Sequence, residues 1–99
     1  MSFRVRYAAG AREDLLRLYG FLLRQDAGLA RRARNAIAKA VEMLGEFPFT
    51  CRKATPDNPF LRELLIPFGA AGYVALFEIE DERTVTILAV RHQREDDYH

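Results

Sequence analysis

The stretch Gly72–Tyr98, GYVALFEIEDERTVTILAVRHQREDDY, predicts a β-hairpin followed by a polar, charged tail. Residues 73–79 and 84–90 are rich in β-branched, aromatic and other apolar side chains, and an acidic turn at 80–83 separates them. The second run is apolar on one face and nearly so on the other, which predicts a strand inside the sheet. Because polar and charged residues follow it at once, the end of this strand is the first place to look for a functional site.

Upstream of the hairpin, the sequence predicts a short strand and two helices. Phe3, Val5 and Tyr7 alternate with arginines, as in a half-buried strand. Apolar residues then recur at helical spacing over 11–24 and again over 29–46. Between them, Asp26 is expected to cap the second helix and Gly28 to take a left-handed cap position. The short connection predicts an antiparallel helical hairpin.

The middle of the chain predicts a long loop and one more strand. Prolines, Asp57 and Asn58 interrupt residues 50–59, so we expect the longest loop there. Residues 61–66 have strand character, and 67–72 form a turn into the hairpin. The order βααβββ predicts an α+β fold of two layers, with the helical hairpin packed on a small, mostly antiparallel sheet. We expect residues 1–99 to form a single domain.

The composition argues against several classes of protein. Cys51 is the only cysteine, residues 1–6 lack a secretory signal, and no apolar run approaches the roughly 20 residues that span a bilayer. These features predict a cytoplasmic protein without membrane contact. The two histidines and Cys51 have no metal-ligand spacing, and no glycine-rich phosphate loop is present, so we expect no metal and no cofactor.

The net charge of +1 conceals an asymmetry between the two halves of the chain. Residues 1–53 hold 11 basic against 5 acidic side chains, whereas residues 54–99 hold 4 against 9. A folded domain with this division has a dipolar surface that could attract an acidic partner. The charges could equally do no more than solvate the helices.

The chain resembles the RelE/ParE toxin superfamily of bacterial type II toxin-antitoxin systems in its element order, in the Gly72-Tyr73 pair that opens the third strand, and in the run RHQREDDY (91–98) that closes the fourth. Residues Val90–Arg94 resemble its ParE-like, or plasmid-stabilisation, branch in particular. This resemblance implies a toxin that inhibits DNA gyrase without catalysing a reaction. It also implies neutralisation by a cognate ParD-type antitoxin of the ribbon-helix-helix type.

The RelE-like branch of the superfamily implies a second hypothesis, a ribosome-dependent endonuclease that cuts mRNA. Such cleavage needs a group that activates the ribose 2′-hydroxyl, a cation beside the phosphate and a proton donor for the departing oxygen. By the same resemblance, those roles would fall to Arg62, His92, Arg94 and Tyr98. Val74, however, stands where the RNA-cutting members carry an arginine. The ParE-like interpretation, with no catalytic residue, is therefore favoured, and an inactive toxin that still binds antitoxin is a third hypothesis.

The resemblance further implies an antitoxin interface that covers the helices and part of the sheet. The expected partner-binding residues are basic and apolar side chains of the two helices and the segment after them, namely Arg17, Phe21, Leu22, Arg24, Arg31, Arg34, Phe47 and Phe49. The arginines suit an acidic antitoxin segment, whereas the aromatic side chains could equally be ordinary core. A functional tail is expected at Arg91, His92, Arg94 and Tyr98, although the histidine could equally be hydrogen-bonded at a strand end and the arginines paired with nearby acids.

Overall fold

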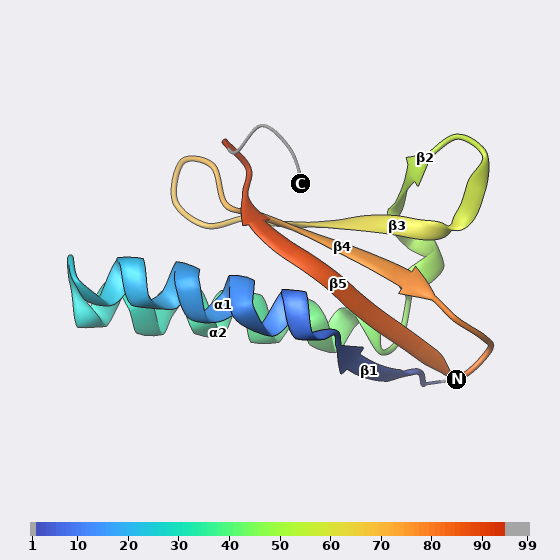
Figure 1. The fold of residues 1–99 in the computed structure, drawn as a ribbon, viewed down its shortest axis with the longest axis horizontal. Coiled ribbons are helices and arrows are strands. Elements are labelled where there is room, and N and C mark those ends of the chain that lie inside the picture. The colour runs from blue at the N-terminus through green and yellow to red at the C-terminus, as the bar shows by residue number, and fades with distance from the viewer. Residues whose placement is uncertain (1, 95–99) are drawn as a thin grey trace.

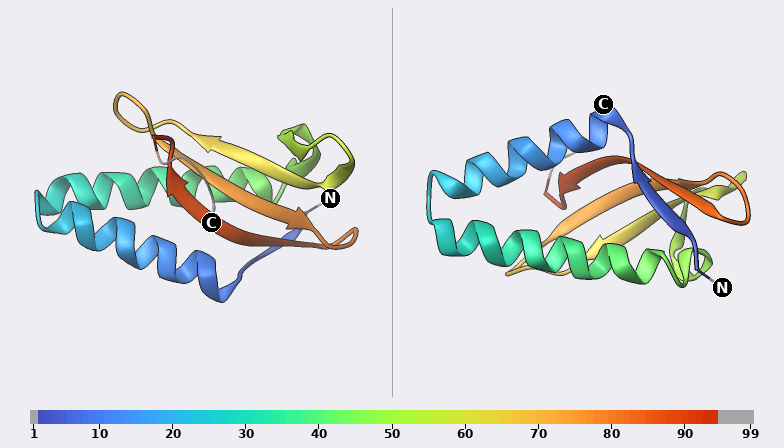
Figure 2. Two further views of the ribbon diagram at one scale, coloured as in Figure 1. Left: turned by 45° about the horizontal axis from the view of Figure 1, so that its top comes forward. Right: turned by 90° about the horizontal axis from the view of Figure 1, so that it is seen from below.

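The computed structural model describes residues 2–94, which form a sheet covered on one face by a pair of antiparallel helices (Figures 1 and 2). The elements in chain order are β1 (Arg4–Tyr7), α1 (Ala9–Leu23), α2 (Ala27–Leu44), a short 3₁₀ helix η1 (Pro48–Thr50), β2 (Arg52–Thr55), β3 (Asn58–Ile66), β4 (Tyr73–Ile79) and β5 (Thr84–His92). The strands lie in the order β1-β5-β4-β3-β2. β1 runs parallel to β5, and the other neighbours are antiparallel.

The predicted α+β architecture is confirmed, with one strand more than the sequence pattern indicated. Residues 50–59, expected as a loop, contain the end of η1, the strand β2 and the start of β3. β2 is a short edge strand without apolar alternation, so it carries no periodic signal. It pairs with β3, and the Arg52 Nε donates to the Glu63 Oε1 across the ladder at 2.9 Å.

Both helices begin and end within two residues of the predicted limits. Of the two capping predictions at their junction, the one for Asp26 is confirmed and the one for Gly28 is not. The Asp26 Oδ1 accepts hydrogen bonds from the backbone N–H groups of Gly28 (2.7 Å) and Leu29 (3.3 Å), which confirms the predicted cap. Because the helix already begins at Ala27, Gly28 lies in its first turn, and its predicted left-handed conformation was wrong. The glycines with positive φ in the described chain are Gly69 (+62°) and Gly72 (+102°), both in the β3–β4 turn.

The core lies between the helical hairpin and the sheet. Phe77 on β4 and Val85 and Ile87 on β5 are fully buried, and Leu18 and Ile37 cover them from the two helices. β5 lies between β1 and β4, so the expectation of an inner strand is confirmed. Burial of these large apolar side chains is the main force that holds the two layers together.

α1 also covers the part of β5 that β1 does not reach. β1 ends at Tyr7, which pairs with Ile87, and the next residue of β5, Leu88, forms a bulge. Beyond the bulge the outer edge of β5 has no strand neighbour. The Asp14 Oδ2 on α1 instead accepts a hydrogen bond from the Val90 N–H at 2.9 Å. This contact fixes the strand end that carries His92.

Candidate functional site

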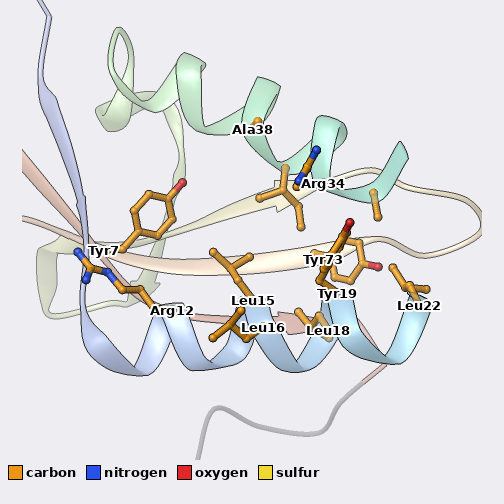
Figure 3. A pocket seen from close by; sticks show the side chains of 12 residues that line it. Tyr7, Arg12, Leu15, Leu16, Leu18, Tyr19, Leu22, Arg34, Ala38 and Tyr73 are labelled. Carbon is orange, nitrogen blue, oxygen red and sulfur yellow. The ribbon is translucent and has the colours of Figure 1, made fainter. Parts of the chain in front are cut away.

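Two hollows lie on either side of α1, and the first is a groove of about 590 Å³ between α1 and α2 (Figure 3). We call it the inter-helix groove and define it by Leu15, Leu16, Tyr19, Arg34, Ile37 and Ala38. It is open because α2 contributes small side chains where a larger one would close the space between the helices. Leu16 is 73% exposed on its rim. The Arg34 guanidinium lies 5.6 Å from the centre of the Tyr19 ring, so the groove joins an apolar surface to a positive charge.

The second hollow, of about 630 Å³, lies between the C-terminal half of α1, the β3–β4 turn and the end of β5. We call it the basic hollow and define it by Arg17, Phe21, Arg24, Phe68, His92 and Arg94. After Phe68, the turn contributes only small residues to its wall, at Gly69, Ala70 and Ala71. Leu18, Leu22 and Tyr73 line both hollows, so α1 and the start of β4 form the wall between them.

A chain of aromatic contacts forms one side of the basic hollow. Phe68 and Tyr73 stack with ring centres 6.0 Å apart, and the His92 ring meets Tyr73 edge-on at 5.6 Å. Tyr73 pairs with His92 in the β4–β5 register, which explains why these rings meet. The His92 Nδ1 accepts from the Arg94 N–H at 3.2 Å, so a neutral imidazole carries its proton on Nε2. Burial raises the pKa of Tyr73, which therefore stays a neutral hydroxyl.

The charged side chains that line the basic hollow within residues 2–94 are all basic. Arg17 and Arg24 come from α1 and Arg94 from the residues after β5, and no acidic side chain lines the hollow within the described chain. Arg17 forms an ion pair with Asp14 at 3.7 Å. Arg24 and Arg94 have no carboxylate partner among residues 2–94. The hollow therefore favours ligands with negative charge.

The predicted partner-binding residues are divided between four places. Arg17, Phe21, Leu22 and Arg24 line the basic hollow, and Leu22 and Arg34 line the inter-helix groove. Arg31 is exposed on α2 and lines neither. Phe47 and Phe49 are exposed beyond the far end of α2, and an 18-residue helix of about 27 Å separates them from the α1–α2 turn (Figure 1). These residues therefore do not form one continuous groove.

Arg62 does not lie with the predicted tail residues. Its Nη1 donates to the carbonyl oxygens of Cys51 (2.7 Å) and Phe49 (3.0 Å), its Nε donates to the Pro59 carbonyl (2.8 Å), and the guanidinium lies over the Phe49 ring. Along β3 it is four residues from Ile66, the residue that pairs with Tyr73, so it is about 13 Å from the His92 end of the sheet. Arg62 thus holds η1 and β2 against β3.

The remaining tail residues divide between the two faces of the sheet. Arg91 pairs with Val74 and points away from the face of His92, because successive side chains of a strand alternate. Tyr98 lies outside the described residues. The sequence patterns missed Phe68 and Tyr73 as lining residues. The signal that could have found them is the run of small residues at 69–72, since such a turn leaves space beside the strand it opens.

No three His, Cys, Asp or Glu side chains within residues 2–94 gather closely enough to hold a metal ion. Burial raises the pKa of the Cys51 thiol, with Arg62 opposing the shift, so this thiol is a poor ligand and nucleophile near neutral pH. Neither helix in the described part of the chain is long and apolar enough to cross a membrane.

Comparisons with known proteins agree with this geometry. A solved structure of the chromosomal ParDE TA system of P. aeruginosa covers 92% of this chain and 96% of its own, with a TM-score of 0.72 and 17% identity, which shows a shared fold. Toxin RelE3 of Caulobacter vibrioides is 33% identical over 85 residues, covering 86% of this chain and 88% of its own. Toxin RelE1 of the same organism is 32% identical over 79 residues, covering 80% and 82%. The family model of the ParE toxin of the type II toxin-antitoxin system parDE matches residues 5–97. The chain therefore belongs to the ParE toxin family of type II toxin-antitoxin systems.

Proposed function

We propose that this toxin acts by binding, inhibits DNA gyrase, and is neutralised by a ParD-type antitoxin of the ribbon-helix-helix type. The observation that carries the proposal is the inter-helix groove, in which Leu16 is exposed beside other apolar side chains and near Arg12 and Arg34. An exposed apolar groove with a basic rim fits an amphipathic helix that carries acidic residues. The match to the parDE family supports the same partner. The proposed target is cytoplasmic, and we place the toxin there as well.

The arrangement around His92 supports a binding function over phosphate chemistry. Arg62, the one cation expected on the second predicted strand, uses its guanidinium to hold backbone carbonyl oxygens at the opposite end of β3. Cleavage of RNA needs a cation placed at the phosphate in the transition state. Arg62 is too far from His92 to supply that charge, and its hydrogen bonds would have to break first.

A ribosome-dependent mRNA endonuclease is the second candidate. It is favoured by the names of the two similar Caulobacter toxins and by the hollow that His92 and Arg94 share. In this candidate His92 exchanges a proton with the ribose or the departing oxygen, and Arg94 contacts the phosphate. An inactive toxin that still binds antitoxin is the third.

Two assays on the toxin freed of antitoxin separate these candidates. Supercoiling by DNA gyrase should be inhibited, mRNA on translating ribosomes should stay intact, and the antitoxin should restore supercoiling. The endonuclease would be established instead if mRNA is cut while supercoiling stays normal, and if His92→Ala abolishes the cleavage while the control Gln93→Ala retains it. No effect in either assay, with antitoxin binding intact, would identify an inactive toxin.

A further inference from the structure

We infer that the basic hollow is a second docking site, which takes an acidic polypeptide segment with one bulky apolar side chain and makes the contact between toxin and target protein. The role in target binding rests on the proposed function. The docking site itself rests on the charge, the floor and the position of the hollow.

The charge of the hollow selects the sign of the ligand. Arg17, Arg24 and Arg94 approach it from two separate parts of the chain, and no acidic side chain among the described residues lines it. The floor between them is apolar, which weakens dielectric screening of a bound carboxylate. Acidic side chains placed around the rim would therefore be attracted to Arg24 and Arg94, and less strongly to Arg17, whose charge Asp14 partly offsets.

The floor of the hollow indicates an apolar anchor. Phe21 is 54% exposed there, and Leu22 lies beside it on α1. The turn also lines the hollow with Ala70 and Ala71, whose small side chains leave room for a larger one. A bulky side chain bound there would remove the Phe21 ring from water, as anchor residues do at the centre of protein interfaces.

The aromatic contacts favour a polypeptide over a nucleic acid strand. Single-stranded nucleic acids bind by stacking bases on free ring faces and by following a row of cations. Here Phe68 stacks on Tyr73 and His92 meets Tyr73 edge-on, so one face of the Phe68 ring and one face of the Tyr73 ring are covered, and the exposed ring of Phe21 has no such contact among residues 2–94. The arginines share the hollow with the apolar side chains of Phe21, Leu22 and Phe68, which suit an apolar side chain of a polypeptide.

The basic hollow is separable from the inter-helix groove. Arg24 and Arg94 line only the basic hollow, whereas Leu16 lines only the groove. All three are exposed, so substitutions there should leave the fold intact. The two surfaces can thus be changed one at a time.

The first test uses a fluorescein-labelled peptide of Asp and Glu residues with one central Trp, titrated against the isolated toxin. The double variant Arg24→Glu/Arg94→Glu should bind it at least roughly tenfold more weakly. The matched control Arg31→Glu/Arg32→Glu makes the same charge change at exposed positions outside both hollows and should bind within about twofold of wild type. Equal losses in the two variants would overturn the site. The proposal would also be overturned if a peptide with Gly in place of Trp binds equally well. It would be overturned too if a uridine oligonucleotide binds more tightly than the peptide and this binding depends on Arg24 and Arg94.

The second test asks whether the site contacts the target. The double variant should lose gyrase inhibition by roughly tenfold or more and keep antitoxin binding, whereas Leu16→Glu should do the reverse. Gyrase inhibition unchanged in the double variant would overturn the target role, and loss of antitoxin binding in that variant would overturn the separation of the two surfaces. If wild-type toxin does not inhibit gyrase, the proposed function fails, and the peptide titration still decides whether the docking site exists.

Discussion

Replacement of Asp14 by alanine should destabilise the protein and loosen the end of β5. The Asp14 carboxylate accepts from the Val90 N–H at 2.9 Å, on the edge of β5 that β1 leaves uncovered. Val90 is only 1% exposed, so water cannot readily replace the lost acceptor. The substitution therefore leaves a backbone donor unsatisfied inside the protein.

The magnitude follows from the two contacts that Asp14 makes. A hydrogen bond to a charged acceptor contributes about 1.5–3 kcal/mol. The ion pair with Arg17 adds little, because the Arg17 side chain is 53% exposed and pairs of this kind contribute about 0–1 kcal/mol. We expect the free energy of unfolding to fall by about 2 kcal/mol. In a domain of this size that lowers Tm by about 8–16 °C.

Thermal unfolding and amide hydrogen exchange together test this prediction. Asp14→Ala should lower Tm and speed exchange of the Val90 amide, whereas Asp14→Asn, which keeps an oxygen acceptor, should lose less. Glu13→Ala is the matched control, since Glu13 is the exposed neighbour of Asp14 on α1. A Tm for Asp14→Ala within about 2 °C of the control, with Val90 exchange unchanged, would refute the assigned contact.

Three further outcomes are expected from the fold. Gly72→Ala should lower the free energy of unfolding, measured in urea, by about 3 kcal/mol or more, because Gly72 has a positive φ and an added Cβ would collide with a β3 carbonyl oxygen. Gly69→Ala also has a positive φ but meets open space, so it should lower this free energy by only about 1–2 kcal/mol. Equal losses in the two variants would contradict this account. Arg62→Met should lower the free energy of unfolding by about 2 kcal/mol, because three hydrogen bonds to backbone carbonyl oxygens are lost, and should leave gyrase inhibition by the folded protein unchanged. A variant that is stable but does not inhibit gyrase would instead indicate a direct role of Arg62 in inhibition. Burial raises the pKa of Tyr7 and Tyr73, so the folded state resists their ionisation. The stability that this contributes is full below about pH 10 and falls as the pH rises above it. In a pH titration followed by tyrosinate absorbance, two tyrosines should ionise at higher pH than a free tyrosine, and one of them should be missing in Tyr7→Phe.

The sequence patterns predicted the elements that bury a periodic apolar face. β4 was found at its observed limits and β5 to within two residues, because their inward side chains alternate. β2 was missed because an edge strand of four residues needs no apolar alternation; its pairing depends on the backbone ladder and on Arg52 beside Glu63. Periodicity reports burial, and β2 buries little.

The candidate site was predicted less completely, for a different physical reason. His92 and Arg94 were found because polar residues directly follow an apolar strand. Phe68 was missed because its neighbours in the hollow come from α1 and β5, which sequence spacing does not relate to it. Phe47 was placed in one partner-binding set with residues near the α1–α2 turn. Its apolar side chain indicates that it could contact a partner or the core, but it does not indicate at which end of a helix the residue lies.

The short first strand explains why the basic hollow exists. β1 ends at Tyr7, and the chain turns directly into α1. If β1 continued along β5 past Ile87, a strand would occupy the edge at Val90, and α1 would begin beyond the end of the sheet. Because the strand stops, α1 crosses that edge, and Asp14 supplies the acceptor that a longer strand would have supplied. The C-terminal half of α1 then overhangs the end of β5, and this overhang holds Arg17 and Arg24 in the same hollow as His92.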